Sequence, residues 1–191
     1  MRLYLIRHAA VTVRPDRPGP QWHLSPEGRA AAETLAEEPY WADLRLMYTS
    51  TEPKAVGTAQ RISSRHNLPV RTEPDLREVR GRDWVGEESY RELAKRYLAG
   101  DGVDGWEPKE AALQRVRSCI SGIVDESGGA DVGLVSHGLI LTIYLADLLG
   151  LDARTSCDLW SGLRFPDVAV VDPKAKRMER EFGQQRPRYK A

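Results

Sequence analysis

Apolar and polar positions along the chain repeat one plan three times. An apolar, β-rich run is followed by a short junction and then by a helical pattern. The apolar runs are Leu3–Ile6, 44–50 and 131–137, and the helical patterns that follow them cover 25–38, 51–66 and 138–150. Strands that alternate with helices predict an α/β fold, a three-layer sandwich whose central sheet is mostly parallel and has helices on both faces.

Two of these helices have recognisable start signals. Ser25 precedes Pro26, which is the order expected for an N-cap and the first helical residue. In the second helix, Thr51 is the expected N-cap and Pro53 lies in the first turn. Both helices are therefore expected to begin directly after loops that follow strands.

The remaining pattern predicts further elements. A short strand is expected at 68–72, and two helices are expected at 88–100 and 108–127. Near the end of the chain, 167–172 and 177–182 read as two strands of a hairpin around 173–176. The pattern does not fix the order of the strands in the sheet.

Length and composition indicate one domain. A chain of 191 residues with 41% hydrophobic content can build one substantial core, so we expect a single catalytic domain at 1–183. The segment 184–191 is polar and basic, and we expect a flexible tail.

Charge and cysteine content narrow the classes of partner. The 28 basic and 28 acidic residues balance, which argues against a nucleic-acid or membrane-surface partner. The longest apolar stretch, 139–151, carries Asp147 and is shorter than the roughly 20 residues of a membrane span. Cys119 and Cys157 have no metal-ligand spacing, and the first apolar run is too short for a signal peptide. A cytoplasmic protein without a metal or cofactor is expected.

Chemically active side chains collect at the three strand-to-helix junctions. They are Arg7 and His8 at the first, Ser50, Thr51 and Lys54 at the second, and Ser136, His137 and Gly138 at the third. In parallel sheets, ligands bind beyond the carboxyl ends of the strands. If the three strands are neighbours, one sheet edge carries two cations, two imidazoles and the N–H groups of two helix starts.

This combination favours an anion as the ligand. Lys54 has the wrong sign for the first turn of a helix unless an anion shares that position, although an isolated lysine there is more often a solvated surface residue. A histidine after a strand is also more often structural than catalytic when it stands alone. A metal site built from His8, His137 and an acid is conceivable, but Arg7 and Lys54 would weaken metal binding. Imidazole, guanidinium and ammonium groups around one anion favour phosphoryl transfer.

Five motifs in order carry a resemblance. The chain resembles the histidine phosphatase superfamily, the phosphoglycerate mutase-like enzymes, in "LIRHAAV", "TSTEPKAVGTA", "LREVRGRDWVG", "WEPKEAALQRV" and "LVSHGL". The fourth match is loose, and together the motifs span Leu3 to about Leu141. The family's first motif is Arg-His-Gly after the first strand, so Ala9 replaces its glycine.

The resemblance implies a role for each matching residue. His8 would be the phosphorylated nucleophile, and Glu78 would protonate the leaving oxygen and then activate water. Arg7 and His137 would bind the phosphoryl oxygens, with His137 also stabilising charge in the transition state. Spacing alone does not distinguish Glu78 from the other acids of its loop.

Three further residues are candidate phosphate ligands. Lys54 stands where the family usually has a second arginine, and a lysine supplies a point charge without the planar two-pronged grip. Arg14 falls where many members have an asparagine that touches phosphate, and it could restore that contact. Gly138 begins the third helix and contributes to its N-terminal N–H groups.

We therefore expect a phosphatase that hydrolyses phosphate monoesters of small molecules through phospho-His8. Phosphoglycerate-mutase-type transfer and a non-catalytic phospho-ligand-binding module are the alternatives. The loop 12–24 and the region 84–106 are expected to wall the pocket, where Trp22, Trp84 and Trp106 either pack or stack on substrate. The sequence leaves the substrate and the oligomeric state open.

Overall fold

A computed structural model describes residues 1–81 and 84–184. Its six strands form one sheet in the order β3-β2-β4-β1-β5-β6. The strands are β1 (Leu3–Arg7), β2 (Leu46–Thr49), β3 (Val70–Thr72), β4 (Val132–Ser136), β5 (Asp167–Asp172) and β6 (Arg177–Arg180). The first four are parallel, whereas β5 runs antiparallel to β1 and β6 antiparallel to β5. The prediction of a mostly parallel sheet and a terminal hairpin is confirmed.

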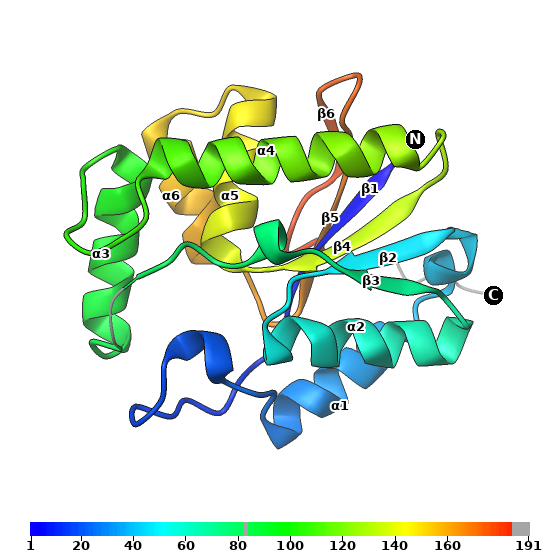
Figure 1. Ribbon diagram of the computed structural model, residues 1–191, viewed down its shortest axis with the longest axis horizontal. Coiled ribbons are helices and arrows are strands. Elements are labelled where there is room, and N and C mark those ends of the chain that lie inside the picture. Colours follow the sequence, from blue (N-terminus) through cyan, green and yellow to red (C-terminus); the bar gives the residue numbers. More distant parts are fainter. Residues whose placement is uncertain (82–83, 185–191) are drawn as a thin grey trace.

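Six α-helices of the described chain surround this sheet. They are α1 (Pro26–Leu35), α2 (Pro53–His66), α3 (Glu87–Ala99), α4 (Lys109–Glu126), α5 (Gly138–Leu149) and α6 (Ala153–Gly162), and short 3-10 turns occur at Gly19–Gln21, Pro39–Asp43 and Pro74–Leu76. Figure 1 shows α1 and α2 on one side of the sheet and the other four helices on the opposite side. The expected three-layer sandwich is confirmed.

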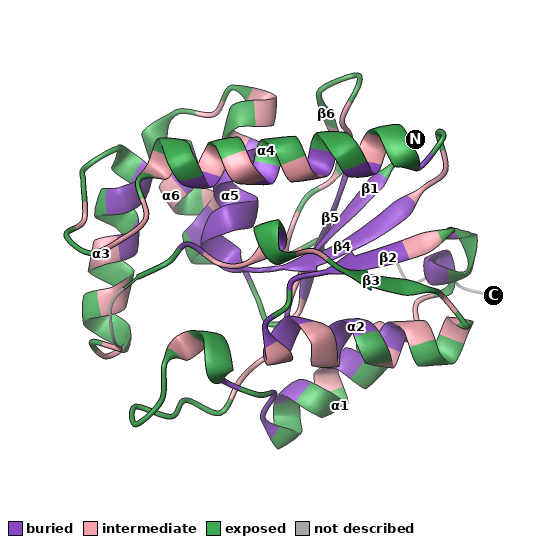
Figure 2. Cartoon of the chain, viewed as in Figure 1, coloured by how far each residue is buried: buried purple, intermediate pink, exposed green. Residues whose placement is uncertain are grey.

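The protein has a hydrophobic core on each face of the sheet, and the side chains of β1 alternate between the two cores. Leu3 and Leu5 join the cluster that includes residues of α3, α4, α5 and α6, while Tyr4 and Ile6 join the cluster with α2. Successive residues of a strand point to opposite faces, so a run apolar on both faces fits only between two helical layers. Figure 2 shows the consequence, with β1 up to Ile6, β4 and the first two turns of α5 buried.

Helix ends match the sequence in two cases and differ in one. The Ser25 side chain accepts a hydrogen bond from Gly28 N at 3.0 Å, as expected of an N-cap, and α5 ends at Gly150 with φ +67°. Thr51 is not the N-cap of α2. That position belongs to Glu52, which makes no side-chain capping bond because its carboxylate is directed to other partners.

One helix was not expected from the pattern. The helix α6 begins after Asp152, whose carboxylate accepts from Thr155 N at 2.7 Å. Within the described residues, none of the helices is both long enough and apolar enough to cross a membrane. The expected flexible tail falls outside the described residues from 185 onward.

Candidate active site

The carboxyl ends of three adjacent strands form the site. Arg7 of β1 is in register with Ser136 of β4, and His8 N donates to Ser136 O at 3.0 Å. On the other side of β4, Ser50 N donates to Val135 O at 2.9 Å. The prediction that the three junctions lie at one sheet edge is thus confirmed, with β4 in the middle.

A cavity opens at this edge. Its volume is about 830 Å³. The residues that line it include four from the three junctions, which are Arg7, His8, Lys54 and Gly138, and the two acids Glu52 and Glu78. This volume lies within the range typical of small-molecule sites, about 300–1,000 Å³. His137 lies in the same region but is fully buried.

His8 has one free nitrogen. Its Nδ1 lies 2.7 Å from Ala9 O, and because a carbonyl oxygen only accepts, Nδ1 carries the proton and Nε2 keeps its lone pair. Burial, together with the charges of His137, Lys54 and Arg7, holds the pKa of His8 well below its usual value. The imidazole is therefore neutral at physiological pH and has a nucleophilic nitrogen available.

Alanine fits at position 9 without strain. Ala9 is fully buried, its backbone lies outside the left-handed region, and its N–H donates to Thr58 Oγ1 at 3.0 Å. Thr58 in turn donates to Lys54 O at 2.8 Å, which ties the turn after β1 to the first turn of α2.

Arg7 is held rigidly beside His8. Its NH1 donates to Leu163 O at 2.9 Å, and its guanidinium carbon lies 3.5 Å from the ring centroid of Phe165. Burial lowers the pKa of Arg7 to about 10, so the side chain stays charged at neutral pH. Gly138 permits this packing, since a Cβ there would lie 3.3 Å from Arg7 Nε.

The ring of His137 is held in place by a hydrogen bond with Ser50. Its Nε2 is hydrogen-bonded to Ser50 Oγ at 2.8 Å and lies 3.6 Å from Glu52 Oε1. Burial, followed by the charges of Lys54 and Arg7, keeps the pKa of His137 well below its usual value. Its ring centroid lies 5.1 Å from that of His8, in an edge-on arrangement.

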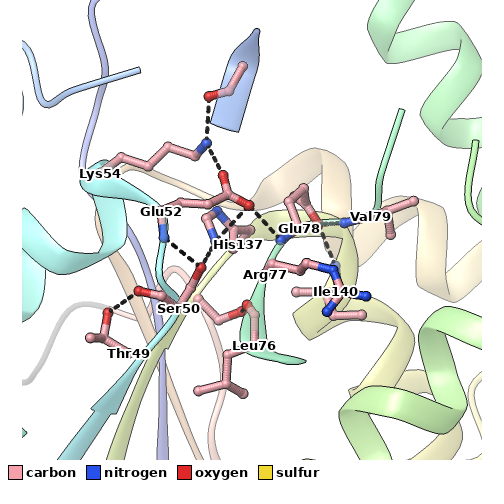
Figure 3. A network of polar contacts seen from close by, with 12 residues as sticks. Thr49, Ser50, Glu52, Lys54, Leu76, Arg77, Glu78, Val79, His137 and Ile140 are labelled. Carbon is pink, nitrogen blue, oxygen red and sulfur yellow. Dashed lines mark hydrogen bonds and ion pairs between the residues drawn. The ribbon is translucent and has the colours of Figure 1, made fainter. Parts of the chain in front are cut away.

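Lys54 and Glu52 form a buried ion pair, which belongs to the network of polar contacts around His137 and Glu78 in Figure 3. Lys54 Nζ donates to Glu52 Oε2 and to Gly19 O, the latter at 2.9 Å. The other oxygen of Glu52 accepts from Glu78 N at 3.0 Å. Glu52 therefore joins the cation, the second histidine and the acidic loop into one cluster.

Glu78 lies at the N-terminus of α5. Its carboxylate accepts from Leu139 N at 3.1 Å, from Ile140 N at 2.9 Å and from Val79 N at 3.0 Å. Burial raises the pKa of Glu78, and the three backbone N–H groups act in the opposite direction. Such a carboxyl group exchanges a proton closer to neutral pH than an ordinary glutamate does.

The structure does not bring Arg14 into the cavity. Its exposed side chain pairs with Asp16, with Nε 3.1 Å from Oδ1. In this structure the carboxylate two residues away in the same loop holds the guanidinium outside the cavity, and a contact of Arg14 with phosphate stays a prediction.

Sequence reasoning missed two residues of the site. Glu52 was one of many acids, and only its position two residues before Lys54 could have drawn attention to it. Tyr90 on α3 lines the cavity, and burial together with the charge of Glu78 raises the pKa of its hydroxyl. Its place in an amphipathic helix gave no signal of this.

A paired arrangement of neutral imidazole, buried guanidinium and buried carboxyl groups is suited to transferring a phosphoryl group. The cations can hold an anion, His8 can attack it, and Glu78 can move a proton. Among the described residues, no cluster of three or more His, Cys, Asp or Glu side chains has the geometry of a metal site.

Comparison with known proteins gives consistent results. The model of the histidine phosphatase superfamily (branch 1) matches residues 3–162. The chain is 26% identical over 206 residues to the adenosylcobalamin/alpha-ribazole phosphatase of Escherichia coli strain K12, covering 94% of this chain and 99% of that protein.

Two solved structures show a similar fold. Mycobacterial glucosyl-3-phosphoglycerate phosphatase in a complex with VO3 superposes with a TM-score of 0.76 at 25% identity, covering 90% of this chain and 92% of that one. YhfR of Bacillus stearothermophilus superposes with a TM-score of 0.77 at 22% identity, covering 95% and 96%.

Proposed function

Because the chain belongs to the histidine phosphatase superfamily (branch 1), we propose that it hydrolyses phosphate monoesters of small molecules through a phosphohistidine on His8. The observation that supports this most directly is the fixed tautomer of His8. The hydrogen bond from Nδ1 to Ala9 O leaves the lone pair on Nε2, in a residue that lines the cavity.

In the first step, Nε2 of His8 attacks the phosphorus atom. A nitrogen–phosphorus bond forms, the ester oxygen–phosphorus bond breaks, and the protonated carboxyl group of Glu78 gives its proton to the departing alkoxide. The raised pKa of Glu78 supports this role, because the group must be protonated at the pH of the reaction.

In the second step, water attacks the phosphohistidine. The Glu78 carboxylate accepts a proton from the water as the nitrogen–phosphorus bond breaks, which releases inorganic phosphate and regenerates His8. The three backbone N–H groups on Glu78 stabilise its ionised form at this stage.

Four residues would hold the phosphoryl oxygens in both steps. Arg7 and Lys54 supply positive charge, His137 supplies a ring nitrogen, and Gly138 contributes at the start of α5. Within the described chain, Arg7 Nε and His137 Nδ1 are buried and have no hydrogen-bond partner. A buried polar atom without a partner costs about 1–3 kcal/mol, so an oxyanion that satisfies these atoms would gain binding energy.

The proposed chemistry takes its positive charge from side chains and is expected to need no metal ion. We place the protein in the cytoplasm, where thiols such as those of Cys119 and Cys157, which form no disulfide bond, stay reduced.

The test compares the wild type with His8→Ala on an aryl phosphate. The variant should lose activity by at least a thousandfold, and acid-labile phosphohistidine should be trapped only in the wild type. His23→Ala serves as the matched control, because His23 is exposed and lies outside the cavity. Equal rates for wild type and His8→Ala would overturn the proposal.

The products of the reaction distinguish a phosphatase from the alternative, a mutase. A phosphatase releases free phosphate from a monoester, whereas a mutase returns the phosphoryl group to the substrate as an isomer. Isomer formation without phosphate release would favour the mutase.

A further inference from the structure

Aromatic side chains form a continuous series along the cavity wall. Ring centroids lie 5.1 Å apart for Trp22 and Trp84, 5.8 Å for Trp84 and Tyr90, 5.6 Å for Tyr90 and Trp106, and 6.3 Å for Tyr90 and Trp160. We call these five residues the aromatic ladder. All five line the cavity, although they come from four separate parts of the chain.

The inner end of the ladder reaches the proposed reaction centre. Trp160 Nε1 lies 3.3 Å from the point where a Cβ on Gly138 would be, beside the Arg7 guanidinium. The hydroxyl of Tyr90 is close enough to Glu78 and Arg7 for their charges to affect its pKa. A group attached to a phosphate at His8 would therefore extend along these rings.

Packing does not account for all five rings of the ladder. Trp22 and Trp160 are buried, with 8% and 7% of their surface exposed, although less completely than Trp41, Tyr48 and Tyr97 among the described aromatics. Trp84, Tyr90 and Trp106 are only partly buried and border open space. Rings exposed to a cavity in this way are available to stack against a ligand.

The other lining residues add guanidinium planes to the ladder. Apart from the ladder, the polar side chains of the described wall away from the reaction centre are nearly all charged, and they are Arg80, Arg91, Arg96, Glu87, Asp104 and Ser161. The planar guanidinium groups of the three arginines can stack on a flat ring with delocalised electrons, as aromatic side chains do.

We propose, building on the function proposed above, that the natural substrate is a phosphate monoester whose leaving group carries a planar aromatic ring. The ring stacks on the aromatic ladder while the phosphoryl group lies at His8. A cavity of about 830 Å³ has room for both parts, and a three-carbon phosphate would leave most of it empty.

The test uses substrate pairs whose leaving groups are both primary alkoxides and differ in whether they carry a planar ring. A nucleoside 5′-monophosphate is compared with ribose 5-phosphate, and 2-phenylethyl phosphate with ethyl phosphate. Since stacking on an aromatic side chain strengthens binding by about 1–3 kcal/mol per base in other proteins, kcat/KM should be about tenfold or more higher for the ring-bearing member of at least one pair.

Variants of the aromatic ladder test whether these residues cause any preference for ring-bearing substrates. Trp84→Leu and Trp106→Leu should each reduce the ratio of kcat/KM within the pair at least threefold. Phe182→Leu is the matched control, because Phe182 is a partly buried aromatic that does not line the cavity, and its ratio should equal that of the wild type. Two ladder variants are used because one of them could fail to fold.

The outcomes distinguish this inference from the function on which it rests. Hydrolysis of all four monoesters with ratios near one would overturn the aromatic preference and leave the phosphatase intact. A ring preference that survives in both ladder variants would overturn the assignment to these residues. Failure to hydrolyse any monoester, with no phosphohistidine at His8, would overturn the proposed function itself.

Discussion

Glu52 and Lys54 neutralise one another inside the cavity that also contains His8. Their side chains are 8% and 9% exposed, and Glu52 Oε2 accepts directly from Lys54 Nζ. The cation expected to bind phosphate therefore already has an anionic partner. A substrate phosphoryl group must share Lys54 with this carboxylate, which should weaken the binding of phosphate.

Glu52→Gln should strengthen phosphate binding. The amide keeps the shape and one acceptor oxygen, which can serve Lys54 Nζ or Glu78 N but not both as the two carboxylate oxygens do, and it removes the competing charge. A charge about 6 Å away changes an interaction by roughly 1–3 kcal/mol at the effective dielectric of such sites, so the inhibition constant of inorganic phosphate should fall about tenfold. Competitive inhibition assays measure this. Glu37→Gln, an exposed acid of the segment after α1, is the control, and unchanged or weaker inhibition in Glu52→Gln would contradict the prediction.

Lys54→Met should destabilise the fold through the same pair. It leaves the buried Glu52 carboxylate without its cation, and breaking a buried ion pair in this way typically costs about 3–5 kcal/mol. The double variant Glu52→Gln with Lys54→Met removes both charges and should recover most of that loss. Urea unfolding of the wild type, both single variants and the double variant measures the coupling. Additive effects of the two substitutions would show that the pair contributes no coupling energy.

The site could be predicted from the sequence where position along a strand decides geometry. Arg7, His8 and His137 follow apolar runs, and parallel pairing of β1 and β4 necessarily brings their ends together. Glu78 could be selected only through resemblance to a family, because nothing local distinguishes it from Glu73 or Asp75. Its position depends on the backbone N–H groups of α5, some 60 residues later.

Other features depend on contacts that the sequence does not reveal. Glu52 acquires its role only when the end of β2 meets the Glu78 loop, 26 residues away. The pairing of Arg14 with Asp16, which turns its guanidinium away from the cavity in this structure, could not be read from its position in the sequence. The central place of β4, last of the four parallel strands in sequence, likewise follows from tertiary pairing.

Gly138→Ala should impair catalysis without unfolding the protein. The new Cβ would lie 3.3 Å from Arg7 Nε and NH2 and from Trp160 Nε1, so the guanidinium must move. Small displacements of a positioning group can change rates by up to about a hundredfold, and we expect a loss of about tenfold in kcat/KM. Gly122→Ala in α4 is the matched control, because its Cβ would meet no atom within 4 Å. That control should keep wild-type activity and gain about 0.5–1 kcal/mol of stability. Wild-type kcat/KM in Gly138→Ala would show that Arg7 tolerates the shift.

The two buried histidines should make stability depend on pH. Burial and nearby cations hold the pKa values of His8 and His137 well below 6.5. These histidines therefore become protonated near pH 6.5 in the unfolded chain but stay neutral in the folded protein. The free energy of unfolding should therefore fall as the pH drops from 7 to 5.5, by up to about 1.4 kcal/mol per pH unit for each histidine.

His8→Gln isolates one of these contributions. The raised pKa of Glu78 has the opposite effect on the free energy of unfolding, because as the pH falls the folded protein binds that proton before the unfolded chain does. Glu78 is present in both the wild type and the variant, so its contribution largely cancels when their stability curves are compared. Urea unfolding at closely spaced pH values should give a shallower decline for the variant below pH 6.5. Parallel stability curves would mean that His8 titrates in the folded protein as it does in the unfolded chain. In that case His8 would be largely protonated at pH 5.5, and its lone pair would not be available for attack on phosphorus at that pH.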